Sequence, residues 1–148
     1  MFTMQTILKR QLILLKKLKE DLGMEIIVVI GGPLDKGAIR RWFNQKLQQK
    51  DSQEFQFIGV DGGCLKLMEE ELPIDLAIGD FDSISLEDKE ILKNYASKMI
   101  EFPSEKDFTD FEEALMWIAK SYPRKKVHVL GAFGGRVDHA ISCLWTMF

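Results

Sequence analysis

Two aspartates, Asp80 and Asp82, stand directly after a short apolar run that ends in Gly79. Such a run is typical of a strand buried on both faces of a parallel sheet, so both carboxylates are expected at the carboxyl end of a strand. Ligands of open α/β sheets bind at that edge, and two acids separated by one residue can direct their oxygens at one hard cation. The spacing therefore predicts a site for Mg²⁺ and phosphate.

Further acids follow two other apolar runs. Asp61 comes after the run 55–60, where it either caps the next helix or binds a ligand. Asp107 and Asp110 follow the run 98–102 and are spaced to share one helix face. One interpretation makes Asp107 the N-cap of the next helix and Asp110 its matching third-position acid; the other adds both to the acidic site.

Cationic residues accompany these acids. Lys106 directly precedes Asp107 and can meet a polyphosphate. Arg136 lies in a glycine-rich loop after the last apolar run, where exposed backbone N–H groups and a guanidinium can grip an anion. In the same loop, His139 either hydrogen-bonds a ligand or supports Asp138.

The elements that must position these residues alternate between strands and helices. Strands are predicted at 25–30, 55–60, 75–78, 98–102 and 126–130, and a helical pattern follows each of them. This alternation predicts an α/β fold, a three-layer α/β/α arrangement around a mostly parallel, Rossmann-like sheet with right-handed crossovers.

Residues 1–23 are predicted to add an amphipathic N-terminal helix before the domain of residues 24–148. Its leucines recur at helical spacing, at Leu8, Leu12, Leu15, Leu18 and Leu22, with lysines and an arginine between them. The preferred interpretation is that these leucines dock on the domain; a membrane-surface or partner-binding helix is the alternative.

Composition narrows the functional classes. A chain of 148 residues, 46% of them hydrophobic, suits one compact domain with a real core. The net charge of −3 with mixed signs argues against nucleic-acid binding. Cys64 and Cys143 lack metal-site or redox spacing and are interpreted as core thiols. No apolar run is long enough to cross a bilayer and no signal peptide is visible, so a cytoplasmic protein without a membrane partner is expected.

Taken together, four motifs resemble the thiamin pyrophosphokinase family. They are Asp61-Gly62-Gly63, the run from Ile78 to Ile84, the run from Lys106 to Asp110, and Gly131 with the run from Gly134 to His139. The resemblance implies Mg²⁺-dependent transfer of a diphosphoryl group from ATP to thiamin, which gives thiamin diphosphate and AMP. It also implies a homodimer.

The resemblance assigns roles to individual residues. The metal is expected at Asp61, Asp80, Asp82 and Asp110, and catalysis at Asp80, Asp82, Asp110 and Arg136. Nucleotide contacts are expected at Asp61, Gly62, Ser83, Lys106, Asp107, Thr109, Asp138 and His139. In the family a β-rich domain that helps to bind thiamin follows the α/β domain. This chain ends at Phe148, where that domain would begin, so we expect residues 24–148 to be the nucleotide-binding catalytic domain and the β-rich domain to be absent.

Two other functions remain open at this point. The run from Ala77 to Asp82 resembles the DxD motif of haloacid-dehalogenase-like phosphohydrolases, with Asp80 as the nucleophile, although Ile84 replaces the Thr or Val of that motif. A non-catalytic nucleotide-binding fragment is the third interpretation.

Overall fold

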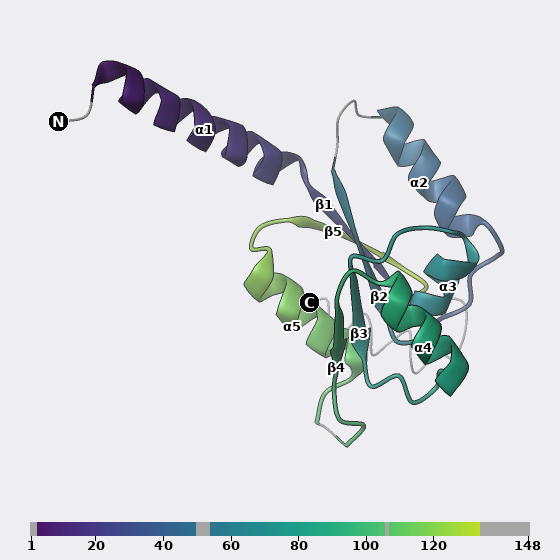
Figure 1. The fold of residues 1–148 in the computed structure, drawn as a ribbon. Helices are drawn as coiled ribbons and strands as arrows, with labels where there is room; N and C mark the ends of the chain where they lie inside the picture. The colour runs from purple at the N-terminus through teal and green to yellow at the C-terminus, as the bar shows by residue number, and fades with distance from the viewer. Residues whose placement is uncertain (1–2, 50–53, 106, 134–148) are drawn as a thin grey trace.

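The computed structural model describes residues 3–49, 54–105 and 107–133, with the side chains of 16–22 excepted (Figure 1). Its strands are β1 (Glu25–Val29), β2 (Phe55–Val60), β3 (Leu76–Gly79), β4 (Met99–Glu101) and β5 (Lys126–Leu130). Its helices are α1 (Met4–Gly23), α2 (Ala38–Gln49), α3 (Gly63–Glu69), α4 (Leu86–Tyr95) and α5 (Asp110–Ser121). The predicted alternation of strands and helices is confirmed from β1 to β5, and the helix predicted after β5 lies outside the described residues.

The strands form one parallel sheet in the order β4-β3-β2-β1-β5. The strand β1, which lies between β2 and β5, is buried along its whole length, as its β-branched sequence predicts for a strand covered on both faces. Successive strands step from β1 to β4 in one direction, and the chain then returns past the whole sheet to place β5 on the other side of β1. The carboxyl ends of all five strands therefore meet at one edge.

Helices cover both faces, which confirms the three-layer prediction (Figure 1). One face of the sheet packs against α5 through Phe111, Ala114 and Ile118. The opposite face packs against α2, α3 and α4 through Ile39, Cys64, Leu67 and Leu92. The side chains of each strand alternate between these two cores, since successive residues of a strand point to opposite faces.

Cys64 is fully buried in the second core, as predicted for a core thiol. Burial raises the pKa of Cys64 to about 12, so the thiol stays protonated and unreactive at neutral pH. Cys143 lies outside the described residues.

The prediction that the α1 leucines dock on the domain is wrong. Leu8, Leu12 and Leu15 are 53%, 69% and 65% exposed, and α1 extends away from the sheet instead of lying on it (Figure 1). Leu18 and Leu22 fall among the side chains that are not described. The amphipathic pattern correctly predicted a helix, but a pattern of spacing alone does not specify which surface covers the apolar side. Within the described part of the chain, no helix combines the length and apolar character needed to cross a membrane.

Candidate metal centre

Asp61 reaches the sheet edge directly from β2. Its backbone N–H donates to the carbonyl of Ile78, 3.0 Å away, which extends the β2–β3 pairing by one residue. Its φ of 47° lies in the left-handed region, which aspartate adopts more readily than most residues. Gly62 is the N-cap residue of α3, so the interpretation of Asp61 as a helix cap is wrong and its carboxylate is available for another role.

Asp80 is held by the turn that follows β3. Phe81 has a φ of 56°, unusual for a bulky residue, and its side chain is only 2% exposed. Burying the Phe81 ring anchors the turn in the core, while Asp80 is half-buried and Asp82 is exposed. Phe81 is the positioning residue that sequence reasoning missed. The one available signal was an aromatic residue between two acids directly after a buried strand.

Asp110 is the first residue of α5. The helix is capped by Thr109, whose hydroxyl accepts from the N–H of Glu112 while the Glu112 carboxylate accepts from the N–H of Thr109. The interpretation of Asp107 as N-cap, with Asp110 as its matching acid, is therefore wrong: Asp107 precedes the helix and is exposed. Because Thr109 and Glu112 complete the cap, the Asp110 carboxylate is left to accept from the N–H of Asp80 at 3.0 Å.

The three acids converge. One oxygen from each of Asp61, Asp80 and Asp110 lies within 4.8 Å of the others, and all three residues are half-buried. Within this group, Oδ1 of Asp61 is buried without a hydrogen-bond partner among the described residues. A buried oxygen of this kind needs a compensating donor or cation. The donor set consists of three carboxylates, which are hard oxygen ligands, and it fits the preference of Mg²⁺.

Asp82 and Ser83 lie beside this group. The Asp82 N–H donates to Oδ1 of Asp80 at 3.1 Å, and the Ser83 hydroxyl donates to Oδ2 of Asp61 at 2.7 Å. A side-chain hydrogen bond with Asp80, together with the Asp80 charge, raises the pKa of the exposed Asp82. The structure thus places Ser83 in contact with the acidic group, whereas Asp82 borders it.

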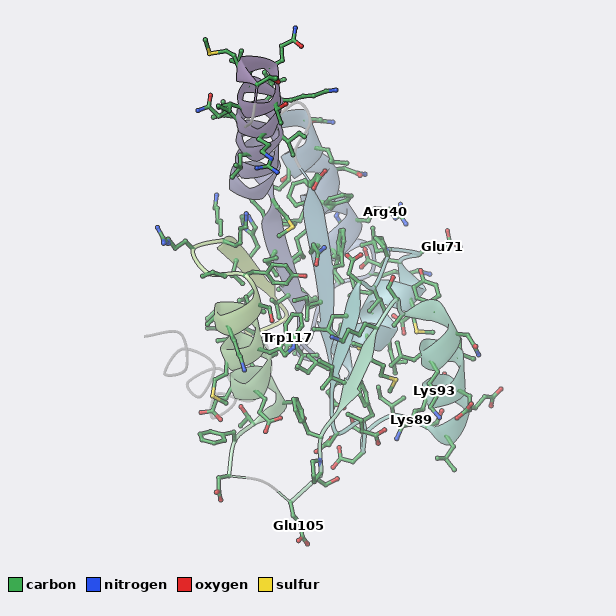
Figure 2. All side chains as sticks on the ribbon, turned by 60° about the vertical axis from the view of Figure 1, so that its left-hand side comes forward. Arg40, Glu71, Lys89, Lys93, Glu105 and Trp117 are labelled. Carbon is green, nitrogen blue, oxygen red and sulfur yellow. The ribbon has the colours of Figure 1, made fainter. Side chains whose placement is uncertain are left out.

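The remaining predicted site residues divide into two sets. The first set is described by the structure and comprises Gly62, Thr109 and Asp107. Gly62 and Thr109 are each next in sequence to one of the three acids. Asp107 lies in the loop from β4 to α5, which extends beyond the sheet with Glu105 at its far end (Figure 2). Lys106, Arg136, Asp138 and His139 lie outside the described residues. Their roles stay predictions.

The three acids repel one another. Burial raises the pKa of Asp61, and the carboxylates of Asp110 and Asp80 raise it further, while the hydrogen bond from Ser83 lowers it. A carboxyl whose pKa is raised by folding binds its proton more tightly in the folded state, so folding stability falls as pH rises from about 4 through the folded pKa.

We therefore expect Asp61→Asn to stabilise the metal-free protein at pH 7, by about 1 kcal/mol. The asparagine removes one charge and can still accept from Ser83. The advantage should shrink as pH falls toward 4, where Asp61 itself becomes neutral, and also on addition of Mg²⁺. Chemical unfolding of both proteins across this pH range measures the effect. A variant less stable than the parent at pH 7 would contradict the assigned repulsion.

Comparison with known proteins identifies the family. The model of the thiamin pyrophosphokinase catalytic domain matches residues 47–148, more than half of the chain. The chain belongs to the thiamin pyrophosphokinase family. All three converging acids lie within the matched residues, and so do the candidate side chains that the structure does not describe.

Relatives and solved structures agree with this membership. The thiamine pyrophosphokinase of Bacillus subtilis is 32% identical over 93 residues, which are 62% of this chain and 42% of that protein. A crystal structure of a thiamin pyrophosphokinase family protein from Enterococcus faecalis is 34% identical with a TM-score of 0.65, and the match covers 82% of this chain and 53% of that one. The yeast thiamin pyrophosphokinase, at 16% identity and a TM-score of 0.62, shares the fold.

The chain thus spans about half the length of the relatives that it matches. Membership in the family argues against the haloacid-dehalogenase-like alternative, because the motifs around Asp80 are now part of a longer match to a different family.

Proposed function

We propose that residues 24–148 bind ATP with Mg²⁺ at Asp61, Asp80 and Asp110 and serve the transfer of a diphosphoryl group from ATP to thiamin, giving thiamin diphosphate and AMP. The observation that carries the proposal is the convergence of these three carboxylates at the carboxyl edge of the sheet in a chain of this family. Bound Mg²⁺ would supply charge stabilisation for the phosphoryl oxygens in the transition state.

The residues of the chain then have separate tasks. Asp61, Asp80 and Asp110 hold the cation, and the Ser83 hydroxyl fixes the orientation of the Asp61 carboxylate. The thiamin hydroxyl attacks the β-phosphorus of ATP, the bond from that phosphorus to the α-phosphate oxygen breaks, and AMP leaves. Asp82, which is exposed and separated from Asp80 by one residue, is the proposed acceptor of the hydroxyl proton. Lys106 and Arg136 are proposed to bind the polyphosphate.

Calorimetry with α,β-methylene-ATP tests the nucleotide site, because this analogue cannot break the bond that the reaction cleaves. We expect binding that requires Mg²⁺. Binding that is equal with and without Mg²⁺, or no binding, would contradict the proposal.

Incubation with ATP tests the transfer. AMP formed only in the presence of thiamin supports the proposed reaction. Mg²⁺-dependent binding without AMP would select the non-catalytic alternative, and a phosphate trapped on Asp80 would select the phosphohydrolase. The homodimer and the cytoplasmic location stay predictions.

A further inference from the structure

The described part of α1 carries a large exposed apolar surface. Seven large hydrophobic side chains in this part of the helix are exposed: Met4, Ile7, Leu8, Leu12, Ile13, Leu14 and Leu15. The two views agree that α1 projects from the body of the domain (Figures 1 and 2). A continuous apolar surface of this kind marks an interaction site more often than it marks an ordinary solvated surface.

These side chains gather on one side of the helix. At 3.6 residues per turn, all of them except Ile13 fall within an arc of about 160°, between Leu14 and Leu12. Ile13 lies on the opposite side, between Lys9 and Arg10. The helix is therefore amphipathic, with Lys9 and Arg10 on its polar side, while Gln11 falls within the arc and Lys19 near its edge.

Charge is distributed unevenly between the helix and the rest of the chain. Residues 1–23 contain five basic and two acidic residues, a net charge of +3. The other residues contain 15 basic and 21 acidic residues, a net charge of −6. The partner of α1 should accordingly be anionic and offer an apolar layer to the leucines.

A second copy of the chain meets these requirements poorly. Two helices of net charge +3 repel each other, and an apolar arc of about 160° is wider than the narrow seam of a two-stranded coiled coil. The acidic body would attract α1 of another copy, but among the residues of the body that the structure describes, the large exposed hydrophobic side chains are scattered over α2, α4, α5 and two loops. They are Leu47, Leu86, Ile91, Tyr95, Phe108, Met116 and Phe133.

An anionic lipid surface meets both requirements. Interfacial helices bury a leucine-rich side at the boundary of the acyl chains and place lysine and arginine among the head groups. We propose that α1 binds the surface of anionic lipid bilayers, with the arc from Leu14 to Leu12 facing the acyl chains. Because α1 extends beyond the domain, it can lie on the bilayer while the acidic body stays clear of the like-charged surface (Figure 1). This inference differs from the expectation that the chain has no membrane partner, which stays a prediction, and it does not depend on the proposed function.

Flotation of the chain with lipid vesicles tests the inference. We expect at least roughly tenfold stronger binding to vesicles of phosphatidylcholine and phosphatidylserine at 3:1 than to pure phosphatidylcholine, because each basic residue near an anionic surface adds affinity. Raising the salt from 0.1 M to 0.5 M should remove most of that difference.

Two variants separate the apolar arc from general stickiness of the helix. Leu8→Gln with Leu15→Gln should weaken binding to the anionic vesicles at least roughly tenfold, since each leucine loses its transfer into the apolar layer. Ile13→Gln, the matched control on the opposite side, should change binding less than about twofold. Glutamine and leucine have similar helix propensities, and far-UV circular dichroism of each variant confirms that the helix is kept.

Three results would overturn the inference. Equal binding to neutral and anionic vesicles would exclude recognition by charge. An equal loss of vesicle binding in the double leucine variant and in Ile13→Gln would exclude the arc from Leu14 to Leu12 as the lipid-binding surface. Absence of vesicle binding would exclude a lipid surface altogether. If sedimentation then showed self-association that the double leucine variant abolishes, α1 would be assigned to contacts between copies of the chain.

Discussion

Replacing Asp80 or Asp110 with asparagine is expected to weaken Mg²⁺-dependent binding of α,β-methylene-ATP at least roughly 100-fold, because each change removes one of three anionic ligands from a hard-cation site. The two positions are informative because they belong to different elements. Asp80 directly follows the strand β3, whereas Asp110 is the first residue of the helix α5. A loss at both would show that the elements contribute to one site. Calorimetric titration at fixed Mg²⁺ provides the measurement.

Glu87→Gln is the matched control for these two variants. Glu87 is an exposed acid in the first turn of α4, outside the group of three, and its substitution removes the same charge. We expect less than about a threefold change in affinity, since exposed charges are screened over the Debye length. If Asp80→Asn and Asp110→Asn also changed affinity no more than Glu87→Gln, the cation could not be held by this group.

Gly63→Ala is expected to destabilise the fold by about 3 kcal/mol or more, because a Cβ at this position would lie 1.9 Å from the carbonyl oxygen of Val29 and 2.5 Å from its carbon. Val29 belongs to the buried strand β1, and Gly63 is a buried residue of α3, so neither backbone can move away without disturbing the core. For a domain of this size, the melting temperature should fall by about 10 °C. Thermal and urea unfolding of the purified variant measure the effect.

Gly62→Ala is a control one residue away. A Cβ at Gly62 meets no atom closer than the Cα of Gly31 at 3.6 Å, and the backbone of Gly62 is already helical, with φ of −58°. This variant should be as stable as the parent or slightly more stable, since alanine lowers the entropy of the unfolded chain. Equal destabilisation by both substitutions would show that the close approach of Gly63 to the Val29 carbonyl is not the reason that this position requires glycine.

The sequence predicted the strands well because their signals are local. The run 55–60 is β-branched and aromatic and matches β2 in full, and 126–130 matches β5 in the same way. The positions of Asp61 and Asp80 after strands followed from this, and parallel strands bring such positions to a common edge. The convergence of the acids was therefore a consequence of topology as much as of residue type.

Other features depended on contacts that are distant in sequence. The choice of Thr109 over Asp107 as the cap of α5 depends on which residue first adopts helical backbone, and both residue types cap helices well. The left-handed backbone of Phe81 accompanies the burial of its ring in the core, and no local preference of phenylalanine predicts that backbone conformation. The exposure of the α1 leucines is likewise a tertiary property, which helical periodicity cannot specify.

The way in which α5 returns past the sheet has a consequence for cooperativity. Asp61 follows β2 and so belongs to the sheet. Asp110 is the first residue of α5, the helix that covers the face of the sheet opposite to α2, α3 and α4. A cation bound to both would act as a removable cross-link that closes a long loop of the chain and, like a disulfide, would lower the entropy of its less ordered states. Occupancy of the site would thereby fasten one layer of the domain to the sheet, so that metal availability would set how tightly the layers hold together.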